Sequence, residues 1–278
     1  MQTFYLSIKL VPRLATVTAL ALGAILSLAS TATAATFRVI IENLAPNNGT
    51  PVTPVWFGIH DGTFDLYDRG APASAELERI AEDGNIAPLN TLFAGSTGGV
   101  AQGSVFGPTI PPITPGETGT ADFRIDLDPS SSLYFSYASM ILPSNDAFIA
   151  NGNPLAHQLF DDAGNFLGLD FIVPGSAVLD AGTEANDELE STTAFFSQSV
   201  PDTGTPTIGG TVEIHPGFIP GGRILSAPQF ANADFTADGY DVVRIRVEKV
   251  PEPGTVLGLL ALGGSMVAWK RRRQMQTS

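Results

Sequence analysis

The sequence predicts an all-β protein: an antiparallel β-sandwich with one short helix. The first observation is a period-two alternation of apolar and polar residues, seen most clearly in "ADFRIDLD" (residues 121–128). The second is the frequency of turn-forming residues: the chain has 29 glycines and 21 prolines, which recur at short intervals between the alternating segments. The third is that several such segments follow one another without an intervening helix, which favours antiparallel sheets over parallel ones.

Four further segments are predicted strands. "TFRVIIENL" (residues 36–44) alternates, and "VWFGI" (residues 55–59) is almost wholly apolar. "SLYFSYASMIL" (residues 132–142) and "YDVVRIRVEKV" (residues 240–250) are long and rich in aromatic or β-branched residues, which is typical of strands.

One helix is predicted, over "SAELERIAEDG" (residues 74–84). Ser74 suits the N-cap, Glu76 and Glu78 suit the first turn, and Gly84 ends the helix. Its apolar stripe is narrow, so we expect it to lie across one end of the sandwich; the stripe consists of Leu77, Ile80 and Ala81.

The first 34 residues have the pattern of a secretory signal peptide. Two basic residues precede an apolar run from Leu14 to Leu28, and small residues follow. Ala32 and Ala34 have the spacing of an A-x-A cleavage site, which predicts cleavage after Ala34. A permanent membrane anchor is the alternative, and the small residues at the end of the segment disfavour it.

Residues 250–278 form a separate C-terminal segment. Val256 to Trp269 is apolar but shorter than the roughly 20 residues that span a bilayer. Four consecutive cations, residues 270–273, follow it and are expected to stay in the cytoplasm. A core helix is the alternative, and the four cations make it a poor fit.

This C-terminal segment resembles the PEP-CTERM sorting signal of bacterial exported proteins. The resemblance rests on Pro251, Glu252 and Pro253, on the apolar stretch, and on the arginines that follow. It implies recognition, and cleavage near Pro-Glu-Pro, by an exosortase-type membrane peptidase. The protein would then be exported to the cell envelope or the extracellular space, with transient membrane anchoring through the C-terminal sorting helix alone.

Residues 35–249 are long enough for one sizeable domain. From Ala35 to Val250 there are 27 acidic and 8 basic side chains, a net charge near −19. This charge argues against nucleic acid or anionic lipid as a partner and suits cations. The chain has no cysteine, which excludes disulfides and thiolate chemistry.

No familiar catalytic motif occurs, such as G-x-S-x-G, H-E-x-x-H or a P-loop, so no catalytic residue is assigned. His60 is followed by Asp61, Asp65 and Asp68, which fits either a metal site or, as the preferred interpretation, a polar loop. Carboxylate pairs of the glycosidase kind stay open as an alternative, because acidic residues are plentiful.

Two aspartates are candidate site residues because each lies at or shortly after the end of an apolar run. Asp146 comes after Met140-Ile141-Leu142, and Asp180 comes after Val178-Leu179. Each fits a turn residue or a ligand for a cation. Calcium needs six to eight hard oxygen donors from flexible segments, which carboxylates beside turns can supply.

The surroundings of these aspartates resemble the spondin N-terminal domain. "SMILPSNDAFI" (residues 139–149) and "LDAGTEAND" (residues 179–187) are similar to its paired P-S-x-D and D-A-G-T segments, and residues 58–89 fit the same family. The resemblance implies an extracellular β-sandwich without catalytic activity that binds one calcium at a sheet edge.

The same resemblance assigns the metal ligands. Asp146 and Asp180 fall on two family ligands, but Arg124 stands where the third, a glutamate, is found. We expect Asp122, on the same strand face as Arg124, to serve as the third ligand; Asp126 and Glu117 are further candidates.

The function predicted from these observations is that of a non-catalytic adhesion or binding module of the cell envelope or extracellular matrix. It would be stabilised by calcium, processed by exosortase, and bind extracellular polysaccharide or a surface protein. One alternative is a hydrolase that acts on extracellular polysaccharide. Another is a structural component of the matrix without a specific ligand.

Overall fold

A computed structural model describes residues 35–109, 111–125, 132–196, 198 and 200–251. The chain divides into two compact units, Met1–Thr33 and Ala34–Ser278. The predicted signal peptide and the apolar part of the C-terminal segment both lie outside the described residues. Within the described part of the chain, no helix is long and apolar enough to cross a membrane.

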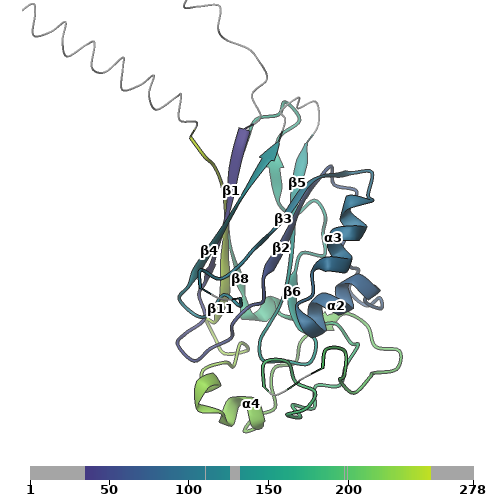
Figure 1. Ribbon diagram of the computed structural model, residues 1–278, viewed down its shortest axis with the longest axis vertical. Coiled ribbons are helices and arrows are strands. Elements are labelled where there is room, and N and C mark those ends of the chain that lie inside the picture. Colours follow the sequence, from purple (N-terminus) through teal and green to yellow (C-terminus); the bar gives the residue numbers. More distant parts are fainter. Residues whose placement is uncertain (1–34, 110, 126–131, 197, 199, 252–278) are drawn as a thin grey trace, which may run out of the picture. The chain divides into compact units, whose positions relative to one another are not determined.

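The described residues form two antiparallel sheets, which confirms the predicted β-sandwich. The four-stranded sheet has the order β4 (Thr118–Ile125), β1 (Ala35–Asn43), β11 (Asp241–Lys249) and β8 (Leu169–Pro174). The seven-stranded sheet has the order β10 (Glu213–Ile214), β9 (Leu179–Asp180), β6 (Ala147–Ala150), β5 (Leu133–Met140), β2 (Val55–His60) and β3 (Gly99–Val105), with β7 (Gln158–Phe160) pairing with β5. Figure 1 shows the two layers.

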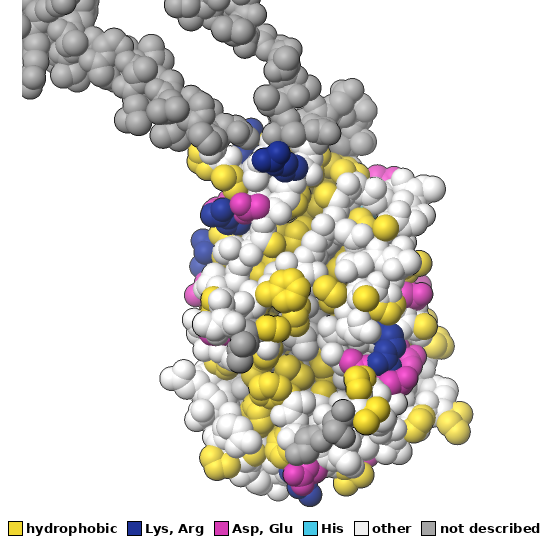
Figure 2. All heavy atoms as spheres, viewed as in Figure 1, with side chains coloured by type: hydrophobic (Ala, Val, Ile, Leu, Met, Phe, Trp, Pro, Cys, Tyr) yellow, Lys and Arg dark blue, Asp and Glu magenta, His cyan; other side chains and the backbone are white. Residues whose placement is uncertain are grey.

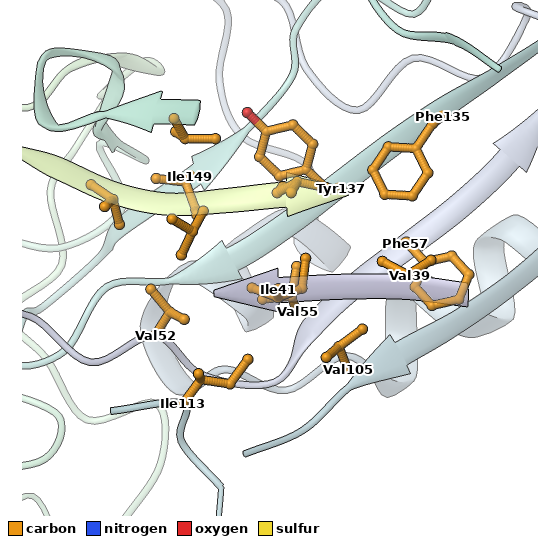
Figure 3. Packing of buried hydrophobic residues seen from close by; sticks show 14 of the residues in the cluster. Val39, Ile41, Val52, Val55, Phe57, Val105, Ile113, Phe135, Tyr137 and Ile149 are labelled. Atoms are coloured by element: carbon orange, nitrogen blue, oxygen red, sulfur yellow. The ribbon is translucent and has the colours of Figure 1, made fainter. Parts of the chain in front are cut away.

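The core lies between the two sheets, as the alternation predicts. Val39 and Ile41 of β1 face Phe57 of β2 and Phe135 and Tyr137 of β5 (Figure 3). All five side chains are buried. Apart from Ile40, the outward positions of β1 and β4 are polar, because period-two alternation sends successive side chains to opposite faces.

Two helices cover the outer face of the seven-stranded sheet (Figure 1): α2 (Ala75–Asp83) and α3 (Ala87–Ala94). Trp56 of β2 is fully buried beneath them, with Ile80 of α2 and Phe93 of α3 in the same cluster. The predicted N-cap is confirmed, because the Ser74 hydroxyl accepts a hydrogen bond from the Leu77 amide. The expected position across one end of the sandwich is wrong: α2 also packs on Phe148 of β6.

The sequence did not predict α3, which is short and begins beside a proline. Three short helical turns complete the described elements: η1 (Gly175–Ala177), α4 (Arg223–Ser226) and η2 (Pro228–Phe230).

Figure 2 shows one face of the molecule in space-filling form. Charged side chains on this face are scattered among uncharged polar groups, and a band of hydrophobic side chains runs down it. The high negative charge of the domain is therefore not concentrated on this face.

Gly84 ends α2 in a left-handed conformation, with φ of 63°, and provides a test of the packing. A Cβ at Gly84 would lie 2.5 Å from Thr53 Cγ2 and 2.7 Å from Thr53 Cβ, whereas at Gly239, with φ of 74°, it would meet nothing within 4 Å. We expect Gly239→Ala to cost about 1 kcal/mol of stability for its backbone conformation alone. Gly84→Ala should cost clearly more, because buried Thr53 must also move. Equal losses in urea denaturation would show that the contact with Thr53 is not tight.

Candidate functional site

Asp146 lies in the turn that leads into β6, and its side chain is fully buried. One carboxylate oxygen, Oδ2, accepts hydrogen bonds from the Thr183 amide (2.9 Å), the Thr183 hydroxyl (3.2 Å) and the Glu184 amide (3.0 Å). All three donors belong to the segment that follows β9. Asp146 therefore fastens this segment to the start of β6.

The other carboxylate oxygen of Asp146, Oδ1, has no hydrogen-bond partner within the part of the chain that the structure describes. A buried acceptor without a partner is destabilising by about 1–3 kcal/mol, and more when it is charged. Burial raises the pKa of Asp146 to about 6, and the nearby negative charge of Asp180 adds to the rise. The site thus contains a carboxylate oxygen that a proton or a cation could satisfy.

Asp180 is the last residue of β9, which pairs with β6. In this register Asp180 lies opposite Ala147, and the Ala181 amide donates to the carbonyl of Asp146 (3.2 Å). The structure therefore brings Asp146, which directly precedes β6, close to Asp180 at the end of β9. Asp180 Oδ1 accepts from the Gly182 amide (2.7 Å) and Oδ2 from the Asn186 side-chain amide (2.5 Å).

Two further residues of this site were missed by the sequence analysis. The Asn186 side chain donates to Asp180, and its Oδ1 lies 3.2 Å from Nε2 of His215. The other ring nitrogen of His215 accepts from the Gly217 amide (3.0 Å). Burial lowers the pKa of His215 to about 4, against the opposing effect of Asp180, so the ring is neutral at pH 7 and donates from Nε2 to Asn186. Asn186 could have been recognised from the sequence, since it lies in the segment LDAGTEAND (residues 179–187). His215 could not, because it is distant from both aspartates in sequence.

Asp122 does not join the pair, which corrects the expected third ligand. It lies on β4 in the other sheet, where the register places it opposite Arg38. Arg38 donates to both carboxylate oxygens (2.7 and 3.0 Å), and this hydrogen bonding lowers the pKa of Asp122. Among the described residues, the group of three or more acidic or histidine side chains with ligand atoms within 4.8 Å of one another is a different one: Glu78, Glu82 and Asp202.

The structure does not place the further candidates for the third ligand, Glu117 and Asp126, beside Asp146 and Asp180 either. Glu117 Oε2 accepts from the Thr114 amide (2.9 Å) in the turn before β4. Asp126 lies outside the described residues.

His60 behaves as a buried structural residue. Its Nε2 lies 2.9 Å from the Ser136 hydroxyl and its Nδ1 accepts from the Gly62 amide (3.0 Å). Asp61 accepts from both the amide and the hydroxyl of Thr63 in the following turn. These contacts favour the polar-loop interpretation over a metal site.

Both predicted processing points lie at the same end of the four-stranded sheet. Phe37 of β1 pairs with Lys249 of β11, and the Val250 amide donates to the carbonyl of Thr36 (2.9 Å). Ala35, which follows the predicted cleavage site, is the first residue of β1, and Pro251 comes directly after Val250. The pairing thus ends where the predicted sorting segment starts.

Comparison with known proteins identifies this segment. Residues 249–274 match the family model of the PEP-CTERM protein-sorting motif. The protein is therefore exported and carries a C-terminal sorting signal of the kind that exosortase recognises. No curated protein matches the chain. The sorting motif begins at Lys249, the last residue of β11. The match therefore concerns the sorting of the protein and does not identify a family for its β-sandwich.

Proposed function

We propose that the sorted protein is a non-catalytic binding module of the cell envelope or extracellular matrix, with a calcium ion held between Asp146 and Asp180. The observation that carries this proposal is the buried Oδ1 of Asp146, which lacks a hydrogen-bond partner among the described residues and lies near a second carboxylate. The two segments on which the resemblance to the spondin N-terminal domain was based, P-S-x-D and D-A-G-T, lie side by side, and this proximity supports a shared site.

Calcium suits this site better than other metals. Its ligands are hard oxygens at about 2.3–2.6 Å, arranged flexibly, and backbone carbonyls and waters complete its shell. Asp146 Oδ1 offers one free oxygen, and the two Asp180 oxygens can each accept more than the single bond they now receive. The ion would neutralise two neighbouring carboxylates that otherwise repel each other.

The fold places this site at the end of the sandwich away from the sorting motif. Asn43, at the far end of β1 from Thr36, donates through its side chain to the carbonyl of Ile113 (2.9 Å). Val52 bridges to both Ile113 and Ile141, and Ile141 begins the turn that contains Asp146. While the sorting motif holds the protein at the membrane, the Thr36–Val250 end would face the bilayer. The turn that contains Asp146 and the segment that follows Asp180 would then face outward, where a polysaccharide or surface protein can reach them.

The sorting step is tested by replacing Pro251, Glu252 and Pro253 with alanine in a host that has an exosortase. We expect the variant to accumulate as a longer, membrane-bound species, because the peptidase no longer finds its cleavage region. Immunoblots of membrane, envelope and medium fractions measure this, and Asp180→Asn serves as a matched control that should be processed normally. Normal processing of the alanine variant would contradict the assignment of the motif.

Binding is tested with a glycan array and with extracellular polymer from the host, each with calcium and with EGTA. The proposal predicts retention that falls when calcium is removed, and no release of soluble sugar from labelled polymer. Release of sugar would favour the hydrolase alternative. In that case the first carboxylates to replace are Asp234, Asp238 and Asp241, which line a surface hollow of about 660 Å³.

A further inference from the structure

A surface hollow of about 530 Å³ lies between three segments that are distant in the sequence. Its lining includes Asn47 and Asn48 of the loop after β1, Phe195 of the segment after β9, and Gln229 of η2. The volume falls within the range of roughly 300–1,000 Å³ that is usual for small-molecule sites. The side chains that line it combine one exposed aromatic ring with several amide groups, and this combination is specific enough to identify a class of ligand.

Phe195 is unusual both in its exposure and in its backbone conformation. Its side chain is 55 % exposed, and its φ is 67°, a left-handed value that is a rare exception for a bulky residue. Its ring makes an edge contact with buried Phe230, with the ring centroids 6.1 Å apart. Both the exposure and the backbone conformation are unfavourable for stability. Strained residues of this kind cluster where a protein holds a ligand.

The amide groups of the hollow are free to bind. The side chains of Asn47, Asn48 and Gln229 are exposed, and within the described part of the chain none of them has a hydrogen-bond partner. Each side-chain amide offers two donors and one acceptor oxygen. A hydroxyl group, which is both a donor and an acceptor, is the group that such amides match best.

The hollow carries no charge, although the domain as a whole has a net charge near −19 from Ala35 to Val250. Each of the nine described residues that line it is uncharged. The larger hollow of about 660 Å³ differs in this respect, because three aspartates line it. An acidic ligand would be repelled by the domain, and a cationic one would prefer the aspartates. The uncharged hollow therefore favours a neutral ligand.

One wall of the hollow is already held in place. The Asn232 side chain donates to the carbonyl of Asn47 (2.8 Å), and the Asn232 amide donates to the carbonyl of Asn48 (3.0 Å). These bonds fix the backbone of both residues and leave their side chains free. A site built in this way loses little conformational entropy when a ligand binds.

We propose that this hollow binds a neutral sugar unit of an extracellular polysaccharide. The apolar C–H face of a pyranose ring would stack on the ring of Phe195, whose face carries the negative part of its quadrupole. The sugar hydroxyls would exchange hydrogen bonds with the amides of Asn47, Asn48 and Gln229. This inference rests on the proposed binding function and adds the class of ligand and the place where it binds.

The hollow is joined to the turn that contains Asp146. The Ala194 amide, next to Phe195, donates to the carbonyl of Ser144 (3.0 Å). The Leu142 amide donates to the carbonyl of Pro51 (2.9 Å), another residue of the lining. An ion at Asp146 would therefore order the segment that presents Phe195, while the sugar itself would bind to side chains that do not hold the ion.

The test uses the mature protein on an array of neutral and acidic glycans, followed by isothermal titration calorimetry with the neutral glycan that is retained best. We expect Phe195→Ala and Phe195→Gly to bind at least about 10-fold more weakly than wild type, because the stacking ring is lost. Gln229→Ala should bind about 2- to 10-fold more weakly. Phe195→Trp, which keeps an aromatic face, should still bind. Phe106→Ala is the matched control, since Phe106 is also exposed but lies outside the hollow, and it should bind as wild type does.

Urea denaturation separates a binding role of Phe195 from a structural one. Glycine adopts a φ of 67° without a steric penalty, so Phe195→Gly should be at least as stable as Phe195→Ala while it binds no better. Phe195→Gly also keeps the test valid if the alanine variant does not fold.

The outcomes distinguish this inference from the calcium proposal. Retention that is lost in Phe195→Gly supports the hollow, whether or not EGTA changes it. Retention that falls in EGTA but is unchanged in Phe195→Gly overturns the hollow and leaves the calcium proposal standing. The hollow is also wrong if Phe106→Ala weakens binding equally, if only acidic glycans are retained, or if no glycan is retained.

Discussion

Asp180→Asn is expected to remove about 2.7 kcal/mol of the stabilisation that calcium gives, when calcium is present at roughly 100 times its dissociation constant. The reason is that the ion at Asp146 loses its second carboxylate. Asparagine keeps the size of the side chain and an oxygen that can accept from the Gly182 amide. For a domain of this size the loss corresponds to about 5–11 °C in melting temperature.

Asp122→Asn is the matched control for this prediction. Asp122 is paired with Arg38 on the other sheet, so its replacement should leave the calcium response unchanged. Thermal unfolding of all three proteins, with calcium and with EGTA, provides the comparison. If Asp180→Asn responds to calcium as the wild type does, the ion does not bind where we place it.

Glu184→Gln is expected to make the calcium-free protein more stable at pH 8 than the wild type. The pKa of Glu184 is raised from 4.5 to about 7 in the folded protein. A raised carboxyl pKa means that the folded state binds the proton more tightly than the unfolded state. Its contribution to stability is therefore greatest below about pH 4.5 and is lost as the pH rises through 7. At pH 8 the penalty amounts to at most about 3 kcal/mol, and glutamine, which does not ionise, avoids it.

The measured quantity is the difference in unfolding free energy between Glu184→Gln and wild type, from urea titrations in EGTA at pH 5 and pH 8. The difference should favour the variant at pH 8 and shrink by more than half at pH 5. The depressed pKa values of His60, His157 and His215 act in the opposite direction, but they act on both proteins and cancel. A variant that is less stable than wild type at pH 8 would show that the Glu184 carboxylate is well compensated without calcium.

Much of the fold could be predicted from the sequence because local patterns specify it. Alternation in residues 36–44 and 121–125 identified β1 and β4 and the faces they bury. Ser74 and Gly84 marked the ends of α2 through the capping chemistry of their own residues. The second helix, α3, has weaker local signals, and it is stabilised by packing Phe93 against Trp56, a contact between residues far apart in the chain.

The candidate site could be predicted only in part, for a related reason. Asp146 and Asp180 stand out because each ends an apolar run, and a strand end beside a turn is a place where carboxylates can meet. Alternation shows which face of a strand Asp122 occupies but not which strand lies beside it, and the β1–β4 register gives it Arg38 as a partner. The influence of the Glu82 charge on the pKa of Glu184 likewise depends on how α2 packs in the fold, which no local pattern specifies.

The most direct test is a crystal structure of the mature protein grown at saturating calcium. We predict an ion at about 2.4 Å from Asp146 Oδ1 and at a similar distance from a carboxylate oxygen of Asp180. A structure in which Asp146 Oδ1 instead accepts a hydrogen bond from a protein group or a water, with no ion between the two aspartates, would contradict it.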